Sequence, residues 1–414
     1  MKRLLVLLIT LAIVMGMAVP AYADSGSGVD VSGELDAAMA YLVRAVPNPA
    51  LGSVGGEWAV LALARSGYSV PSGYYEGYYN RIVQEVQTKY AANGWLDGNK
   101  PTEEQRLTIA LVAIGKDPRN VGGYNLLNRM ADYNNVIKQG DNSTNFALIA
   151  LDTAGFAIPG ITDPSRQATR EKYVDRLLEN QANKLNGSIG IQHHEAGNVD
   201  STAMALQALA RYRDLPGVED GIEWALDYLS DVQMDDGSYS FDISLGDEGS
   251  NVESCAQVLV ALTALGIDPT EDTRFIKYGF TVIDAMLRFQ QSDGSFRHIM
   301  SGSGNNLMAS EQAAYALAAY DRFVKKQNSL YDMTDAFDPD NPIDPEPEFI
   351  RGDINNDSYI DAADVVFLRR YLLKRVGYDF SPSMDVNNDN FIDSADVVYL
   401  SRYILKRPGY TIDP

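Results

Sequence analysis

The sequence has little cysteine, histidine, tryptophan or positive charge. Its 414 residues include one cysteine, three histidines and three tryptophans. A lone Cys255 excludes a framework of internal disulfides. Lysine and arginine number 34 against 56 acidic residues, which gives a formal net charge of −22 at pH 7. This balance argues against nucleic acid and anionic membranes as partners.

Long apolar runs are also missing beyond the first twenty residues. The chain begins with Met1-Lys2-Arg3, continues with an apolar run from Leu4 to Val19, and reaches Ala21-Tyr22-Ala23. This pattern predicts a secretory signal peptide over residues 1–23, with cleavage before Asp24. No later stretch is apolar enough to cross a bilayer. We therefore expect a secreted, extracellular mature chain without membrane insertion, held at a cell surface only through a partner.

The end of the chain contains a short acidic segment twice. Residues 353–364 and 385–396 repeat at an offset of 32, with oxygen-bearing side chains at positions 1, 3, 5, 9 and 12. A calcium ion prefers six to eight oxygen ligands, and position 7 would add a backbone carbonyl. The loops therefore predict two calcium ions. The expected ligands are Asp353, Asn355, Asp357, Tyr359, Asp361 and Asp364 in the first loop, and Asp385, Asn387, Asp389, Phe391, Asp393 and Asp396 in the second.

Each calcium loop is followed by a predicted helix. Val365, Leu368 and Leu372 recur at helical spacing after the first loop, and the second copy keeps the pattern. The unit is EF-hand-like, without the leading helix of a full EF-hand. Position 6, which is usually glycine, is Ser358 or Asn390. Serine tolerates positive φ less well than asparagine, so we expect weaker calcium binding in the first loop.

This duplicated unit resembles a type I dockerin over residues 351–414. The resemblance implies calcium-dependent docking onto a cohesin module of a scaffold protein, as in cellulosomes. It also implies which positions would contact cohesin, namely loop positions 10 and 11 and early helix positions. Those residues are Ala362, Ala363, Arg369 and Arg370 in the first copy, and Ser394, Ala395, Ser401 and Arg402 in the second.

A proline-rich acidic segment separates the tail from the rest of the chain. Residues 338–349 contain four prolines with acids between them. Such a composition favours an extended, self-repelling chain. We expect a linker over residues 338–350, between a large domain at 24–337 and the small domain at 351–414.

The large domain repeats more loosely. A glycine turn recurs every 42 to 57 residues, and an Ala/Leu-rich helix follows each turn. More polar helices with one apolar stripe lie between these apolar ones, which predicts six inner and six outer helices. The fold class expected is therefore all-α, an (α/α)6 toroid, with an open solenoid as the alternative. The glycine turns are at Gly52, Gly94, Gly140, Gly187, Gly237 and Gly294.

Two of these turns resemble the repeat of squalene cyclases and prenyltransferases. The similar stretches are Gln233-x3-Gly237-x-Tyr239 and Gln290-x3-Gly294-x-Phe296. The resemblance implies an α/α toroid, and it says little about the reaction.

The residues that carry the chemistry of those families are only partly present in this chain. Asp200 stands where cyclases place a proton-donating aspartate, but its supporting carboxylates are replaced by Asn198 and Ser201. Helix capping therefore competes with proton donation at Asp200. Glu253-x-Cys255 is similar to a prenyltransferase zinc pair, but the third ligand is missing, which favours a buried, free Cys255.

A polar mouth at one end of the ring is the remaining candidate site. The starts of the inner helices carry acids, and a glycosidase needs two carboxyl groups, one of them with a raised pKa. The pattern does not single out catalytic residues. The candidates are Glu57, Glu104, Asp200, Glu253 and Glu311, the histidines of His193-His194-Glu195 and His298, and the aromatic residues Trp58, Trp95, Tyr239 and Phe296.

The sequence thus predicts a secreted dockerin-bearing protein whose toroid serves polysaccharide breakdown, as a hydrolase of O-glycosyl bonds or as an accessory. The partners expected are a cohesin module and a polysaccharide. The alternative hypothesis is a non-catalytic toroid that binds a peptide, glycan or small ligand. A third, less favoured hypothesis is a terpenoid cyclase-like enzyme.

Overall fold

The computed structural model describes residues 28–182, 186–189, 198–302, 306–340, 351–355, 359–375, 378, 381–387, 389, 391–407 and 409–412. The predicted signal peptide and most of the linker lie outside these residues. The described part contains 14 α-helices and six short 3-10 or π elements, and it contains no β-strand. None of the described helices is both long enough and apolar enough to cross a membrane.

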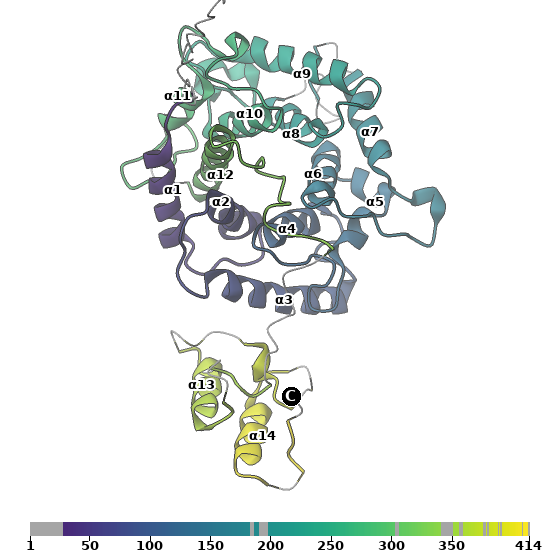
Figure 1. Ribbon diagram of the computed structural model, residues 1–414, viewed down its shortest axis with the longest axis vertical. Helices are drawn as coiled ribbons and strands as arrows, with labels where there is room; N and C mark the ends of the chain where they lie inside the picture. Colours follow the sequence, from purple (N-terminus) through teal and green to yellow (C-terminus); the bar gives the residue numbers. More distant parts are fainter. Residues whose placement is uncertain are drawn as a thin grey trace, which may run out of the picture.

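Twelve helices form two concentric rings (Figure 1). The all-α toroid expected from the sequence is thereby confirmed. The inner ring consists of α2 (Trp58–Ser66), α4 (Thr102–Ala113), α6 (Asp141–Asp152), α8 (Val199–Leu209), α10 (Val252–Ala264) and α12 (Leu307–Val324). The outer ring consists of α1 (Ser32–Ala45), α3 (Tyr74–Asn93), α5 (Tyr133–Ile137), α7 (Arg170–Ala182), α9 (Val218–Val232) and α11 (Val282–Leu287).

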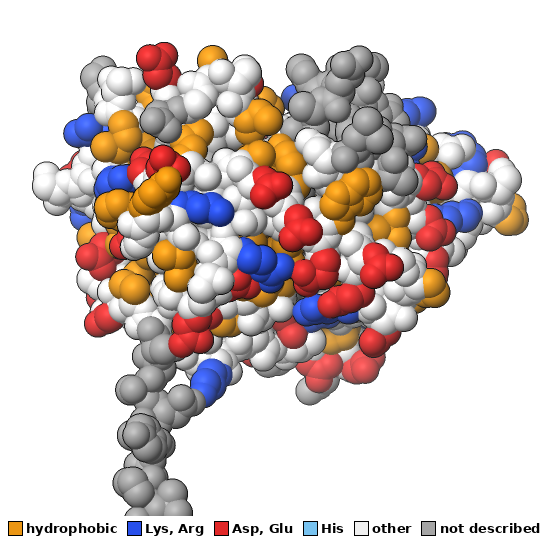
Figure 2. Space-filling model, turned by 90° about the horizontal axis from the view of Figure 1, so that it is seen from above, with side chains coloured by type: hydrophobic (Ala, Val, Ile, Leu, Met, Phe, Trp, Pro, Cys, Tyr) orange, Lys and Arg blue, Asp and Glu red, His pale blue; other side chains and the backbone are white. Residues whose placement is uncertain are grey.

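The two rings differ in burial as their composition predicts. Every residue of α10 from Val252 to Thr263 is buried, because this helix packs on all sides. Helix α9 buries one stripe that includes Ile222, Leu226 and Leu229, and its other face is polar. Figure 2 shows acidic and basic side chains next to each other on one outer face of the ring. The hydrophobic core is therefore the layer between the rings.

The glycine turns allow the repeats to approach one another closely. All six landmark glycines have positive φ, which glycine adopts without steric cost. At Gly294, with φ +88°, a Cβ atom would lie 2.0 Å from the carbonyl oxygen of Ala37 in α1. The last glycine turn thus lies directly against the first outer helix.

The glutamine of the repeat motif connects each turn to the next repeat. Gln233 Nε2 donates to the carbonyl oxygens of Gly237 and Phe275, both at 3.1 Å. Gln290 Nε2 donates to the carbonyl oxygen of Glu34 at 2.8 Å. This second bond joins the last repeat to α1, so the ring is closed and the open solenoid is excluded.

One end of the ring is covered by the segment that follows α12. Met333 N donates to the carbonyl oxygen of Thr153 at the end of α6, at 2.8 Å. The buried guanidinium of Arg65, in the last turn of α2, donates to the carbonyl oxygens of Ser329 and Leu330. In Figure 1 this segment runs across the ring. The covered end is therefore the one at which the inner helices finish.

The tail contains two further helices, α13 (Ala362–Leu372) and α14 (Ser394–Ile404). They have a hydrophobic cluster of their own, separate from the ring's clusters, with Leu368 and Leu400 fully buried at equivalent positions of the two copies. The two copies of the repeated sequence therefore bury equivalent residues in the tail's core.

Candidate functional site

The first turns of the inner helices meet at one end of the ring. Gln105 of α4 donates to Ser143 of α6 at 3.1 Å, and Ser254 of α10 donates to Asp200 of α8 at 2.6 Å. The expected gathering of polar residues at this end is confirmed, and these residues serve two different purposes.

Three of the five predicted acids hold the backbone of neighbouring turns. Oε1 of Glu57 accepts from Gly52 N at 2.8 Å, and Oε1 of Glu104 accepts from Leu96 N at 2.7 Å. The same atom of Glu311 accepts from Gly55 N at 2.8 Å. All three glutamates are fully buried, so their role is to fix the turns onto the inner helices.

Burial changes the protonation of these three glutamates. It raises the pKa of Glu57 and Glu104 to about 7 and the pKa of Glu311 to about 8. Within the described structure, their Oε2 atoms are buried without a hydrogen-bond partner. The guanidinium groups of Arg106 and Arg129 lie 3.7 and 3.9 Å from the Oε2 atoms of Glu57 and Glu104, and their charges oppose the rise in those two glutamates.

The remaining two acids form a different arrangement, which we name the mouth cluster: Asp200, Glu253, Ser254 and His298. Asp200 Oδ1 accepts the hydroxyl hydrogen bond of Ser254, and Glu253 Oε2 lies 2.8 Å from His298 Nδ1. Glu253 is 7% exposed, whereas His298 is open to solvent. Two carboxyl groups from consecutive repeats thus face one sector of the ring.

Helix capping does not account for these two acids. Asn198 caps α8 by accepting from Ser201 N at 2.7 Å, and Asn251 caps α10 by accepting from Ser254 N at 2.8 Å. The capping hydrogen bond predicted for Asp200 is therefore made by Asn198. The carboxylate of Asp200 is left for contacts between helices.

Burial and neighbouring groups shift the protonation of both acids of the mouth cluster. Burial raises the pKa of Asp200 to about 6, and the charge of Glu253 adds to this rise, while Ser254 and His298 oppose it. Burial also raises the pKa of Glu253, and His298 opposes that rise by hydrogen bonding and charge. Burial thus favours the protonated form of both carboxyl groups, whereas Ser254 and His298 favour the ionised form.

A chain of amides lies close to the mouth cluster. Gln207 Nε2 donates to Gln257 Oε1 at 3.0 Å. Gln257 Nε2 in turn donates to Gln312 Oε1 at 3.0 Å and to the hydroxyl of Tyr315 at 2.5 Å. Sequence reasoning missed these residues. A usable signal existed, since Gln257 and Gln312 each follow the capping asparagine of their helix by six residues.

The predicted sugar-stacking aromatics separate into core and surface residues. Tyr239 and Phe296 are fully buried, so they belong to the core. Trp58 is 7% exposed and lies 5.6 Å from Tyr315 between ring centroids, which places it near the amide chain. Trp95 is 40% exposed and belongs to a different part of the ring.

Cys255 occupies a structural position of the repeat. Thr202 and Ser310 stand at the same position in their helices, four residues after the capping asparagine, and accept from Ile189 N and Phe296 N respectively. Cys255 is buried, as predicted, and burial raises the pKa of its thiol to about 12. The thiolate that a zinc ligand or nucleophile needs is thereby disfavoured. The His193-His194-Glu195 segment lies outside the described residues.

The first calcium loop folds around the side chain of Asp364. Its Oδ1 accepts from Ile354 N at 2.7 Å and from Asn355 N at 3.1 Å, and its Oδ2 accepts from Asp361 N at 2.8 Å. Asp361 in turn caps α13, which completes a capping box. The second loop repeats this geometry around Asp396, with Val386, Asn387 and Asp393 as donors at 2.8, 3.2 and 2.9 Å.

The described loop residues fit a calcium ion by charge and burial. Asp364 is fully buried and Asp353 is 4% exposed. Burial and the charge of Asp353 raise the pKa of Asp364, and the same causes act on Asp396 beside Asp385. A divalent cation would offset this repulsion with the hard oxygen ligands it prefers. Asp357 lies outside the described residues, and among the residues that are described, those of the tail loops included, no three acidic, histidine or cysteine side chains converge.

The residues implied to contact cohesin lie on the surface of the tail. Seven of them are exposed, and Ser401 is half-buried and donates to the carbonyl oxygen of Val397 at 2.6 Å. Arg370 bonds the hydroxyl of Tyr378, and Arg402 bonds that of Tyr410 in the same way. The exposed residues are Ala362, Ala363, Arg369, Arg370, Ser394, Ala395 and Arg402.

Comparison with known proteins identifies the tail. Residues 351–405 match the family described as the dockerin type I domain. Among solved structures, unsaturated glucuronyl hydrolase from Streptococcus agalactiae is similar at 11% sequence identity, with a TM-score of 0.46. The match covers 72% of this chain and 93% of the hydrolase chain. Unsaturated glucuronyl hydrolase from Bacillus sp. GL1, responsible for the degradation of glycosaminoglycan, is similar at 12% sequence identity, with a TM-score of 0.41. That match covers 72% of this chain and 97% of the hydrolase chain. No curated protein matches the chain. The chain therefore carries a C-terminal type I dockerin domain behind an α/α toroid.

Proposed function

We propose that this protein is a secreted subunit of a cellulosome-type assembly, which docks onto a cohesin module when its two tail loops bind calcium. The observation that carries docking is the repeated geometry around Asp364 and Asp396, within residues that match a type I dockerin. Calcium bound there would neutralise the buried carboxylates. The chain's own contribution is to hold α13 and α14 with their contact residues exposed.

Titration calorimetry against a panel of type I cohesins tests docking. The full chain should release or absorb heat with at least one cohesin when calcium is present, and the signal should disappear in excess chelator. Binding that is equally tight with chelator would contradict the calcium requirement.

We further propose that the toroid cleaves glycosidic bonds at the end of the ring where the inner helices begin. The mouth cluster supports this, because Asp200 and Glu253 come from neighbouring inner helices and have separate partners, a hydroxyl and an imidazole. Such unequal surroundings are typical of a catalytic acid and base. The amide chain beside the cluster offers hydrogen-bonding groups of the kind that bind sugar hydroxyls.

In the proposed reaction Asp200 is the acid and Glu253 the base. Asp200 gives its proton to the glycosidic oxygen, and the bond from that oxygen to the anomeric carbon breaks. Glu253, oriented by His298, takes a proton from a water molecule, whose oxygen bonds to the anomeric carbon. One water is consumed, and each new chain end carries a hydroxyl group.

Release of reducing sugars from a polysaccharide panel tests the catalytic proposal. Asp200→Asn and Glu253→Gln should each lower the rate about 100-fold or more, the usual contribution of a positioned acid or base. Asp220→Asn, an exposed acid in the first turn of α9, is the matched control. Mouth variants that keep the wild-type rate would contradict the assignment.

A toroid that binds glycan without cleaving it is the second candidate. One observation favours it. Three acids at this end of the ring, Glu57, Glu104 and Glu311, accept hydrogen bonds from the backbone of neighbouring turns, which is a structural role. Retention on a polysaccharide without new reducing ends would select this candidate.

A further inference from the structure

A pocket of about 380 Å³ opens on the outer part of the ring, away from the mouth cluster. It lies between the turn after α3, the 3-10 element η2 (Leu126–Met130), α5 and the loop that reaches η3 (Pro164–Arg166). None of its lining residues belongs to α8, α10 or α12. The volume is at the lower end of the range of roughly 300–1,000 Å³ for small-ligand sites. The pocket is thus a separate place on the molecule.

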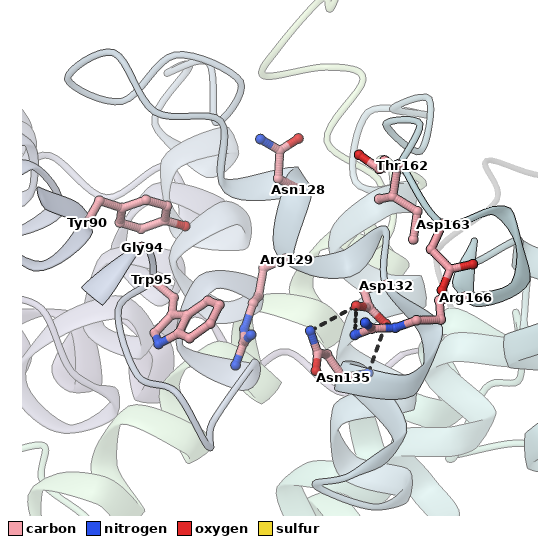
Figure 3. A pocket seen from close by; sticks show the side chains of 11 residues that line it. Tyr90, Gly94, Trp95, Asn128, Arg129, Asp132, Asn135, Thr162, Asp163 and Arg166 are labelled. Carbon is pink, nitrogen blue, oxygen red and sulfur yellow. Dashed lines mark hydrogen bonds and ion pairs between the residues drawn. The ribbon is translucent and has the colours of Figure 1, made fainter. Parts of the chain in front are cut away.

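One side of this pocket is aromatic. Tyr90 and Trp95 line it, and Figure 3 shows them together on one side of the opening. The guanidinium carbon of Arg129 lies 4.8 Å from the centroid of the Trp95 ring. Arg129 also donates to the carbonyl oxygens of Asp97 and Gly98, at 3.1 and 2.9 Å. The indole is therefore fixed in place, and 40% of Trp95 remains exposed.

The opposite side is polar and electrically balanced. Asp132 accepts hydrogen bonds from Asn135 and from the guanidinium of Arg166. The lining contains two arginines and two aspartates, so it favours neither anions nor cations. The exposed side chains of Asn128 and Thr162 stand at the rim of the same opening (Figure 3). The pocket therefore combines a fixed aromatic surface with uncharged hydrogen-bonding groups.

We infer that this pocket is a second glycan-binding site, which holds a neutral stretch of a polysaccharide against Trp95 while another stretch reaches the mouth cluster. Aromatic faces take up the apolar face of sugar rings, and amide and hydroxyl groups bond their hydroxyls. A chain of net charge −22 would also repel polyanionic glycans, which favours a neutral one. The inference rests on the proposed glycan role of the toroid, and it does not require catalysis at the mouth.

Affinity electrophoresis of the full chain through gels that contain neutral soluble polysaccharides, such as xylan, glucomannan and mixed-linkage glucan, tests the site. Trp95→Ala and Asn128→Ala should each raise the dissociation constant at least fivefold. Trp224→Ala is the matched control, because Trp224 is 39% exposed on α9 and does not line the pocket. Circular dichroism establishes whether each variant is folded. If Trp95→Ala does not fold, Asn128→Ala still tests the site, because Asn128 is exposed.

Five results are decisive. Loss of retention in the Trp95 and Asn128 variants, with Trp224→Ala unchanged, supports the second site. Unchanged retention in both pocket variants overturns it, as does wild-type protein that no neutral polysaccharide retards. Loss of retention only in Glu253→Gln places binding at the mouth, which overturns this inference and leaves the proposed function standing. Loss in the pocket variants without any product release from the wild type supports the site and refutes catalysis.

Discussion

Ser254 Oγ donates to Asp200 Oδ1 at 2.6 Å, and this bond ties the first turn of α10 to the first turn of α8. The two residues belong to consecutive repeats, 54 positions apart. The hydroxyl stabilises the ionised form of Asp200 and so opposes the rise that burial imposes on its pKa. The protonation of the proposed acid is therefore controlled from the neighbouring repeat.

Ser254→Ala should raise the pKa of Asp200 by about one unit, because the variant removes a hydrogen bond to the charged form. A group that must be protonated to act then stays active to higher pH. We expect the alkaline limb of the pH–rate profile for polysaccharide cleavage to move upward by the same amount. Carboxyl NMR titration of the protein labelled at aspartate gives the pKa directly.

Ser201→Ala in α8 is the control for this substitution. Ser201 precedes Thr202 as Ser254 precedes Cys255, and in both helices the serine backbone N–H meets the capping asparagine. Its side chain has no hydrogen bond to Asp200 among the described contacts. An equal shift in both variants would mean that the hydroxyl of Ser254 is not the cause.

The closure of the ring depends on the absence of a side chain at Gly294. Gly294→Ala should destabilise the toroid by about 3 kcal/mol or more, because its φ is +88° and the new Cβ would lie 2.0 Å from the carbonyl oxygen of Ala37. Denaturant unfolding followed by tryptophan fluorescence measures this, since Trp58, Trp95 and Trp224 all lie in the toroid.

Gly33→Ala is the matched control for ring closure, because it adds a methyl group to α1, the helix that Gly294 lies against, without a clash. No atom lies within 4 Å of a Cβ at Gly33, which is inside α1. Alanine is preferred to glycine within a helix by roughly 0.5–1 kcal/mol, so this variant should be neutral or slightly more stable. A Gly294→Ala variant as stable as Gly33→Ala would mean that the turn does not set the closure.

The sequence predicted the repeat architecture well, but it predicted poorly the roles of the acids at the starts of the inner helices. Glycine turns and helix periodicity are local signals, and they were enough for the six inner and six outer helices. The roles of Glu104 and Glu253 could not be separated in the same way. Both stand in the first turn of an inner helix, but one bonds Leu96 N and the other meets His298, 45 residues further along. Such pairings are set by tertiary packing and have no local pattern.

The tail loops should lose cohesin binding when their central carboxylates are removed. Asp364→Asn combined with Asp396→Asn keeps the shape of both side chains, while it removes the two most buried charges among the described loop residues. Calcium affinity should fall on the order of 100-fold, because the ion depends on anionic oxygen ligands. Calorimetry with calcium and then with cohesin measures both steps, and Asp340→Asn, near the start of the predicted linker, is the control.

Calcium should also stabilise the folded tail by mass action. The free energy gained is RT ln(1 + [Ca²⁺]/Kd) for each site, or about 2.7 kcal/mol at a hundredfold excess over Kd. Far-UV circular dichroism should therefore give a melting transition of the tail that moves upward with calcium in the wild type. A transition that moves equally in the double variant would show that the ion binds elsewhere.

The stability of the toroid should fall as pH rises through neutrality, and Glu311 should be a main cause. Burial raises its folded pKa to about 8, against roughly 4.3 in an unfolded chain. Between these two pH values the folded state binds one proton more than the unfolded chain does. The contribution of Glu311 to stability is therefore fully present below about pH 4 and is lost progressively as pH approaches 8.

Glu311→Gln removes this titration, while its side-chain oxygen can still accept from Gly55 N. We expect the fall in Tm between pH 6 and pH 9, followed by tryptophan fluorescence, to become several degrees smaller. Glu85→Gln on the exposed face of α3 should leave the fall unchanged, and a Glu311→Gln variant as pH-sensitive as the wild type would locate the sensitivity at Glu57 or Glu104 instead.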